Sequence, residues 1–276
     1  MGETGHDNRR ELARFLRDRR SRVAPQDMGL PVGPHRRTKG LRREEVAVLA
    51  GLSPTWYTYL EQGRDINPSP AVLDSLARVL GLSEDERRYV HLLARTRPVA
   101  ADGSVVDGTV VDGDLVARLV EAAGQGPWPL YAGNRYGDVV AWNQAAARWY
   151  TDFGRLPDAR RNILWWLLTD PEAKRRLPGW HGDALDVVAR LRTAYPPLAG
   201  DPRMSALVTG LSEASPEFRR WWDERHVHGP RLRPRTITAP GLGTRTFHLT
   251  LADVVDSAGH SLVFHLPAPD GGEPEG

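Results

Sequence analysis

Residues 41–64 read LRREEVAVLAGLSPTWYTYLEQGR, and this stretch decides the fold of the first part of the chain. Apolar residues recur at helical spacing on both sides of Gly51, a residue type that readily ends a helix because it adopts left-handed backbone angles. Ser53 and Pro54 then suit the N-cap and the first position of a second helix. The pattern predicts two short helices joined by a sharp turn, the arrangement of a helix-turn-helix.

The two predicted helices divide their side chains between core and solvent. In the first helix, Val46, Leu49 and Ala50 should face the core. In the second helix, Tyr57 and Leu60 lie three positions apart and should anchor it to the same core. The remaining side chains are free to read base edges in the major groove of DNA. These predicted base-reading residues are Thr55, Trp56, Thr58 and Tyr59.

Basic residues surround the motif and are predicted to contact phosphates. Arg42 and Arg43 open the first helix, where a cation opposes the helix macrodipole. A guanidinium beside free backbone N–H groups binds phosphate well, so both are assigned to the DNA backbone. The alternative is that they pair with surface acids such as Glu44 or Glu45. Further predicted DNA contacts are Arg36, Arg37 and Lys39 in the loop before the motif, and Gln62 and Arg64 after it.

More helices are predicted on either side of the motif. Apolar residues at helical spacing predict one over residues 8–23, followed by an exposed loop rich in Pro, Gly and basic groups over 24–40. Ser69-Pro70 starts another helix, and Ser83 with Glu86 forms a capping box for a fifth. The first domain is therefore predicted to be all helical, with five helices in residues 1–97, of which 1–40 form a basic helix and loop.

Charge is distributed unevenly along the chain. Residues 1–99 carry 18 Lys and Arg against 13 Asp and Glu, whereas the rest carries 19 against 22. Up to Arg43 there are 12 basic residues against 5 acidic ones. This bias favours contact with a polyanion such as double-stranded DNA, although basic arms also serve simply to keep proteins in solution.

The chain has no cysteine, which excludes disulfides and thiolate chemistry. Its first residues are charged throughout, and it contains no run of about 18 apolar residues of the kind that spans a membrane. We therefore expect a cytoplasmic protein with no membrane partner.

Composition changes at a stretch rich in Gly, Asp and small residues, predicted to be a linker over 98–113. Beyond it, Leu115–Ala123 and several later segments have helical spacing, whereas 129–134 and 137–143 resemble two strands joined by a turn. Residues 235–267 alternate with period two through Phe247 and again through Phe264. The second domain, 114–270, is therefore predicted to be α+β, and 271–276 to be a disordered tail.

Eight of the nine tryptophans lie between Trp128 and Trp222, which indicates a ligand pocket with aromatic walls. The tandem pairs Trp165-Trp166 and Trp221-Trp222 cannot both point inward from one helix. The alternative is plain core packing. The candidate ligand-binding residues are Trp142, Asn143, Trp149, Tyr150, Leu164, Trp165, Phe218, Trp221, Trp222 and His226, with Arg219, Arg220 or His226 meeting an anionic head group.

Chemistry-bearing motifs are scarce. His226 and His228 have a chelating spacing, but on a helix their rings would point to different faces, so no metal site is predicted. The chain lacks a G-x-S-x-G elbow, a Walker loop and a G-x-G-x-x-G fingerprint. We therefore predict no catalytic residues and no cofactor.

Residues 41–64 resemble the Xre or lambda-repressor-like regulators, with their apolar-Ala, Gly, Ser and Leu-Glu-x-Gly pattern. The resemblance implies a lambda-repressor-like fold for the first domain, a phosphate contact for Arg43, and base-facing positions for Pro54, Thr55 and Tyr59. Pro54 and Trp56 cannot make bidentate contacts to a base, which favours thymine methyls and phosphate packing for them.

The whole chain resembles a narrower group, the MmyB-like regulators, which are common in actinobacteria. The shared runs are residues 15–70, YAGNRYGDVVAWNQAAARWY (131–150), NILWWLLTDPEAKRRLPGW (162–180) and LSEASPEFRRWWDERHV (211–227). This resemblance implies a PAS-like C-terminal domain that binds a small apolar or fatty-acid-like ligand.

The leading hypothesis is a homodimeric transcription regulator whose sensor domain alters DNA binding, with half-sites about one helical turn apart. Two alternatives remain at this level. One is an enzyme with a regulatory helical domain, and the other is an antitoxin-like module whose aromatic half buries against a partner chain.

Overall fold

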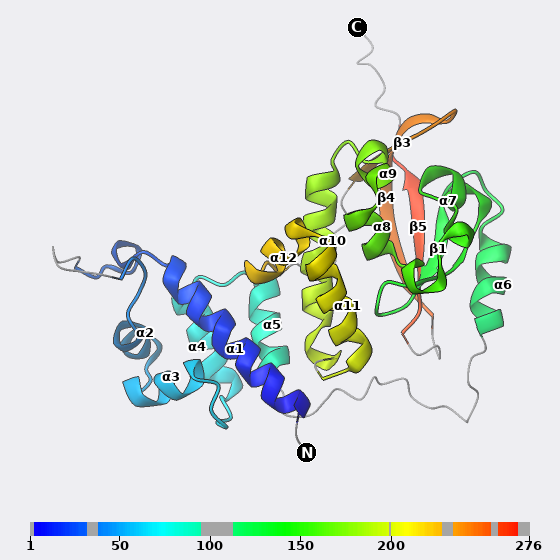
Figure 1. Ribbon diagram of the computed structural model, residues 1–276. Coiled ribbons are helices and arrows are strands. Elements are labelled where there is room, and N and C mark those ends of the chain that lie inside the picture. Colours follow the sequence, from blue (N-terminus) through cyan, green and yellow to red (C-terminus); the bar gives the residue numbers. More distant parts are fainter. Residues whose placement is uncertain are drawn as a thin grey trace, which may run out of the picture. The chain divides into compact units, whose positions relative to one another are not determined.

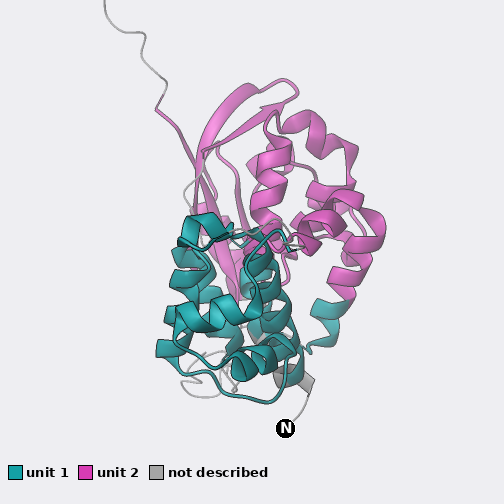
Figure 2. Cartoon of the chain, turned by 90° about the vertical axis from the view of Figure 1, so that its left-hand side faces the viewer, with its two compact units in different colours: residues 1–99, 192–205, 227–229 teal, residues 100–191, 206–226, 230–276 magenta. Residues whose placement is uncertain are grey.

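The computed structural model describes residues 3–31, 38–94, 113–198, 200–227, 234–254 and 259–269. The chain forms two compact units (Figure 2). We call residues 1–99, 192–205 and 227–229 the helical unit, and the remainder the sheet unit. Residues 98–112 of the predicted linker, and the predicted tail 271–276, lie outside the described residues.

The described residues up to Ala94 form five α-helices, as the sequence predicts (Figure 1). The first helix begins five residues before the predicted start at Asn8, and a short 3-10 turn, Pro25–Met28, follows it. The helices are α1 (Glu3–Arg22), α2 (Arg43–Ala50), α3 (Pro54–Glu61), α4 (Pro70–Val79) and α5 (Glu84–Ala94).

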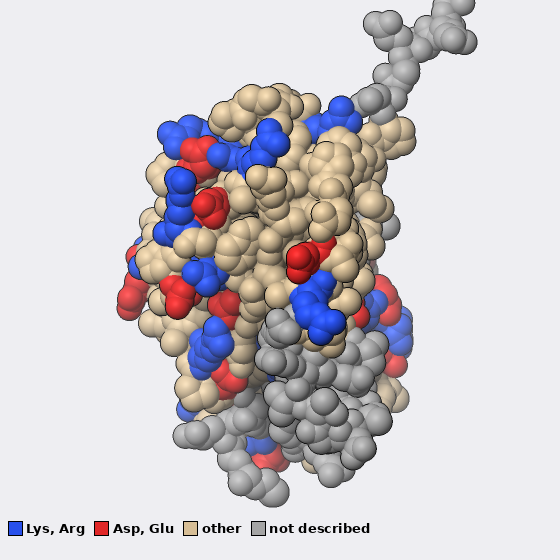
Figure 3. Space-filling model, turned by 90° about the vertical axis from the view of Figure 1, so that its right-hand side faces the viewer, with Lys and Arg blue, Asp and Glu red and all other residues tan. Residues whose placement is uncertain are grey.

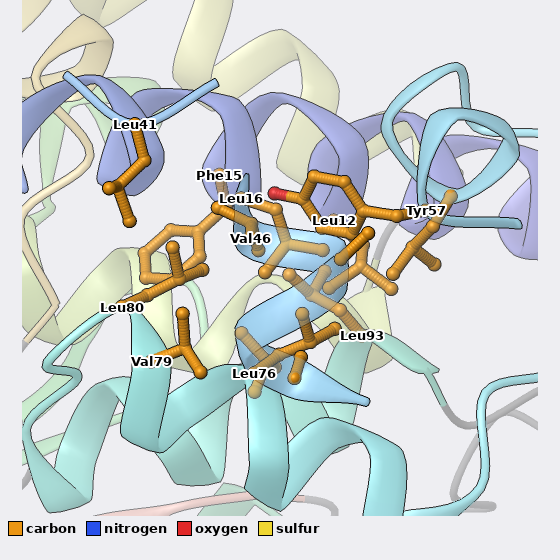
Figure 4. Close-up of a cluster of buried hydrophobic side chains, with 14 of the residues drawn as sticks. Leu12, Phe15, Leu16, Leu41, Val46, Tyr57, Leu76, Val79, Leu80 and Leu93 are labelled. Carbon is orange, nitrogen blue, oxygen red and sulfur yellow. The ribbon is translucent and has the colours of Figure 1, made fainter. Parts of the chain in front are cut away.

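Their apolar faces meet in one core (Figure 4). Phe15 of α1 packs edge-on against Tyr89 of α5, with ring centroids 5.3 Å apart. Tyr57 and Leu60 hold the inner face of α3 in this core, as predicted. Complete burial of each such side chain contributes about 1.5–3 kcal/mol to folding. The orientation of α3 is therefore fixed from within.

The helix ends use the capping residues that the sequence indicates. Ser53 Oγ accepts a hydrogen bond from the Trp56 amide at 3.2 Å, and Ser69 Oγ caps α4 in the same way. Gly51 ends α2 with a φ of 71°, which is strained for any residue with a side chain. Ser83 and Glu86 form the reciprocal capping box of α5.

The sheet unit is built on a five-stranded antiparallel sheet in the order β2-β1-β5-β4-β3. The two early strands join the three late ones because β1 pairs with β5, with Leu130 opposite Phe264. The strands are β1 (Leu130–Gly133), β2 (Val139–Trp142), β3 (Pro234–Ala239), β4 (Gly243–Asp253) and β5 (Ser261–Pro267).

Helices accompany this sheet, which makes the second domain α+β as predicted. They are α6 (Gly113–Ala123), α7 (Gln144–Trp149), α8 (Ile163–Thr169), α9 (Pro171–Arg176), α10 (Trp180–Ala194), α11 (Pro202–Ala214) and α12 (Pro216–Asp223). Asp170 caps α9, whose separate existence the periodicity did not indicate. Short 3-10 turns are found at Phe153–Arg155, Asp158–Arg160 and Pro196–Leu198.

The sheet presents different surfaces to its two sides. On one side Val116 and Val120 of α6 pack against Leu130, Ala132 and Leu262. The opposite side is aromatic, because successive strand residues point to opposite faces. Its rings are Tyr131, Tyr150, Phe153, Phe247 and His265. The ring centroids of the pairs Tyr131–Tyr150, Tyr131–Phe153, Tyr150–His265 and Phe247–His265 are 5.3 to 6.3 Å apart.

A buried polar cluster lies among these rings. His265 Nδ1 is 3.0 Å from the Pro129 carbonyl, which can only accept, so Nδ1 carries the proton and Nε2 accepts from the Tyr150 hydroxyl at 2.5 Å. Arg235 is buried nearby, with its Nε 3.3 Å from Asp183 Oδ1. Burial and the charge of Arg235 lower the pKa of His265 to about 3.

This arrangement predicts acid sensitivity of the sheet unit. The folded protein keeps His265 neutral, whereas the unfolded chain protonates it near pH 6.5, so stability is complete above that pH and is lost as the pH falls toward 3. Between pH 7 and pH 5 we expect a loss of about 2 kcal/mol. Urea unfolding followed by tryptophan fluorescence measures it, because eight of the nine tryptophans lie in this unit. In a His265→Gln chain the same two pH values should give closely similar unfolding free energies.

Candidate nucleic-acid interface and ligand cavity

The outer face of α3 carries the four predicted base-reading residues. Thr55 is exposed, and Trp56, Thr58 and Tyr59 are partly exposed. The Trp56 ring also packs against the helical core, so only part of it is available to a partner. Thr58 Oγ1 donates to the Pro54 carbonyl at 2.8 Å, which fixes its rotamer and leaves its oxygen able to accept.

Three of the predicted residues form a group at the end of α3. The Arg64 guanidinium lies 4.0 Å from the centroid of the Tyr59 ring, and Arg64 Nε donates to Gln62 Oε1 at 2.9 Å. Stacking on an aromatic ring orients an exposed guanidinium before any partner arrives. The cation is thereby held beside the outer face of α3.

The two arginines at the start of α2 differ in their surroundings. The Arg42 amide donates to Glu45 Oε2 at 2.7 Å, while its side chain is exposed. Arg43 Nε donates to Glu61 Oε2 at 2.7 Å, so its ion-pair partner is a buried acid of α3 and not Glu44 or Glu45. The Arg43 side chain remains 44% exposed. Lys39 is exposed, and Arg36 and Arg37 lie outside the described residues.

Glu61 is a residue beneath the outer face of α3 that the sequence analysis did not single out. Its side chain is 0% exposed. The carboxylate accepts hydrogen bonds from Arg20 Nε at 2.5 Å, from Arg20 Nη2 at 3.0 Å and from Arg43 Nε. Burial alone would raise the pKa of Glu61, but hydrogen bonds from Arg20 and Arg43 outweigh it and hold the pKa below its usual value. The signal was available, because Glu61 follows Tyr57 by four positions and so shares its inward face.

The start of the motif is also fastened to α1. The Leu41 amide donates to the Arg20 carbonyl at 3.1 Å, and Arg20 Nη1 donates to the Leu41 carbonyl at 2.8 Å. A Cβ on Gly40 would lie 2.4 Å from the Arg20 carbonyl oxygen, so only glycine fits here. Arg20 therefore links α1 both to the segment that enters α2 and to Glu61 of α3.

A cavity of about 730 Å³ lies in the sheet unit. Its walls come from α6, the loop before β1, β2, α7 and the turn and strand around β4. Of the predicted ligand residues, Trp142, Asn143 and Trp149 line it. The other lining residues are Ala117, Val120, Glu121, Gly124, Gln125, Gly126, Pro127, Trp128, Val140, Ala141, Gln144, Ala145, Arg148, Leu242 and Arg245.

Asn143 holds the walls of this cavity together. Its Oδ1 accepts from the amides of Leu130 at 3.0 Å and Ala146 at 2.8 Å. Its Nδ2 donates to the carbonyls of Gly124 at 3.0 Å and Trp128 at 2.9 Å. These four bonds use the full capacity of the amide, so Asn143 shapes the cavity without a group to spare for a ligand.

The other predicted ligand residues do not line this cavity. Tyr150, Leu164, Phe218 and Trp221 are buried in packing, and Trp222 stacks on Phe218 at 5.4 Å. Trp165 lies beneath Arg160, His226 is 3.1 Å from Glu224, and Arg219 and Arg220 are exposed. In each tandem pair one ring is buried, Trp166 and Trp221, and the other is partly exposed, as helix geometry requires.

Within the described ranges no three His, Asp or Glu side chains come together as a metal site would require. No helix in the same ranges is long and apolar enough to cross a membrane.

Comparison with known families agrees with this geometry. Residues 11–90 match the model of a helix-turn-helix domain, and residues 113–275 match that of the MmyB-like transcription regulator ligand binding domain. The two domains define a DNA-binding transcription regulator with a ligand-sensing domain. The second match spans more than half of the chain, which therefore belongs to the MmyB-like transcription regulators. A search of the curated proteins gave no match.

Proposed function

We propose that this regulator binds DNA as a homodimer, with α3 of each copy in the major groove, and that a small apolar ligand in the sheet unit changes its affinity for DNA. The observation that carries the proposal is the outer face of α3, which presents polar side chains to solvent while Glu61 and the core fix its inner face. We assign 1–97 to DNA binding, 98–113 to a linker and 114–270 to ligand binding. As a regulator of transcription the protein would act in the cytoplasm.

Base reading rests on the spacing of the exposed residues. Thr55, Tyr59 and Gln62 lie four and three positions apart, which aligns them along one ridge of the helix. Thr58 lies next to this ridge. A short ridge of threonine, tyrosine and glutamine side chains offers hydroxyl and amide groups to base edges and methyl groups to thymine.

Phosphate binding rests on the cations around the ridge. Arg42 and Arg43 stand at the N-terminus of α2, Arg64 follows α3, and Lys39 precedes the motif. Arg43 is held by Glu61 through Nε, which leaves its terminal nitrogens to face a phosphate. One motif makes few contacts, so two copies on a palindrome with half-sites about 34–36 Å apart are expected to give useful affinity.

Ligand sensing rests on the cavity beside α6 and α7. Its volume lies within the usual range of small-molecule sites, about 300–1,000 Å³. Three tryptophans and a few aliphatic side chains give it an apolar lining that suits a small, largely apolar molecule.

Fluorescence anisotropy of the full chain with a labelled duplex from upstream of its own coding sequence tests the proposal. Four cations per copy give eight phosphate contacts in a dimer. The logarithm of the binding constant should therefore fall linearly with the logarithm of the salt concentration, with a slope of about −7. Arg42→Ala should reduce this slope by about 2 in the dimer. Binding that does not change between 50 and 200 mM salt would refute the phosphate assignment.

A further inference from the structure

The cavity of the sheet unit is basic as well as aromatic. Among its lining residues are two arginines, Arg148 and Arg245, and one acid, Glu121. Within the described residues no carboxylate pairs with Arg148, whose side chain is exposed on α7. The Arg245 guanidinium lies 5.1 Å from the centroid of the Trp128 ring. On the α6 side of the molecule, which Figure 3 shows, Lys and Arg side chains are interspersed with Asp and Glu side chains.

Its indole walls are held in place by further rings. Trp128 and Trp149 both pack edge-on against Phe247, at 5.8 and 5.2 Å. Trp142 packs against Phe153 at 5.8 Å. Rings fixed by such neighbours keep flat faces and cannot rotate freely to follow a flexible chain.

The aliphatic lining is limited. Val120, Val140 and Leu242 are its largest aliphatic members, and the remaining small apolar residues are alanines and a proline. A long saturated chain gains most from a continuous aliphatic tunnel, because its free energy of transfer grows with each buried methylene. Three fixed indoles beside two guanidinium groups instead favour a short, flat molecule with one anionic edge.

We propose that the cavity binds a planar aromatic acid, with its carboxylate against Arg148 and Arg245 and its ring among Trp128, Trp142 and Trp149. This assignment rests on the proposed sensor function and names the ligand class. Guanidinium groups recognise carboxylates through paired hydrogen bonds, and each such bond to a charged group is worth roughly a factor of ten or more in affinity.

Isothermal titration of the full-length protein with three probes tests this assignment. The probes are 2-naphthoate, its neutral isostere 2-naphthamide, and the flexible acid decanoate. We expect 2-naphthoate to bind once per chain, and both other probes to bind at least about tenfold more weakly. Quenching of tryptophan fluorescence by 2-naphthoate should accompany binding, because the proposed ring site lies among three indoles.

Variants of the full chain locate the site. Arg148→Ala should weaken 2-naphthoate binding about tenfold with little effect on 2-naphthamide. Arg245→Ala provides a second variant at the same edge. Arg155→Ala removes an arginine that is 87% exposed and does not line the cavity, and should bind like the wild type. Melting temperatures of all three variants confirm that they fold.

Four results would overturn the aromatic-acid assignment. Decanoate binding more tightly than 2-naphthoate would place a flexible chain in the cavity and leave the sensor proposal standing. Equal affinity of naphthoate and naphthamide, or no effect of Arg148→Ala, would remove the role of the arginines. Absence of binding by all three probes would reject the ligand class. The DNA titration tests the regulator function separately, since it needs no ligand.

Discussion

Replacing Glu61 with alanine should destabilise the helix-turn-helix by about 3–5 kcal/mol. The substitution leaves Arg20 buried beneath α3 without its carboxylate, and it releases Arg43 at the start of α2. An unpaired buried charge costs far more than an exposed pair contributes, because water no longer solvates it. Since whole domains are stable by about 5–15 kcal/mol, the loss should leave the helical unit largely or partly unfolded.

Urea unfolding of the full chain, followed by circular dichroism of its helices, measures this loss. Glu84→Ala is the matched control, since that carboxylate is 70% exposed and pairs with Arg87 on the same helix. It should change the unfolding free energy by less than about 1 kcal/mol. Because the pKa of Glu61 is lowered in the folded protein, its contribution is present above its ordinary pKa and is lost as the pH falls through the folded value. Similar midpoints for the two variants would contradict a structural role for Glu61.

Replacing Thr55 and Tyr59 together with alanine should weaken DNA binding by roughly 10–100-fold or more. Both lie on the outer ridge of α3, and loss of the Tyr59 ring also removes the platform that orients Arg64. Neither side chain contributes to the Glu61 network, so folding should be preserved. Arg43→Ala is a poorer test, because it deprives a buried carboxylate of a partner and alters stability as well as phosphate contact.

The local features of the helical unit follow from the sequence. Ser53, Ser69 and the Ser83 capping box mark helix starts, and Gly51 marks an end, because each position needs a residue type with that capacity. The ion pairs that Glu61 forms with Arg20 and Arg43 do not follow from the sequence in this way. Arg20 and Glu61 are 41 residues apart, and periodicity assigns a residue to a face without stating which distant side chain it will meet.

The residues that line the cavity were harder to predict for a related physical reason. Tryptophans at helical spacing serve packing as readily as binding, and Trp221 and Trp222 are examples packed within their own unit. Arg245 reaches the cavity only because β4 is aligned with the rest of the sheet through its pairing with β5. Register between distant strands, which brings such residues together, cannot be read from alternation alone.

Contact between the outer face of α3 and DNA is tested by an anisotropy titration of the Thr55→Ala/Tyr59→Ala chain. Wild type and Arg88→Ala, an α5 variant that removes an exposed cation, are titrated beside it on the same duplex and at the same salt concentration. The double variant should lose at least about tenfold in affinity, whereas Arg88→Ala should change the affinity little. A folded double variant that binds as tightly as wild type would show that this face of α3 does not contact DNA.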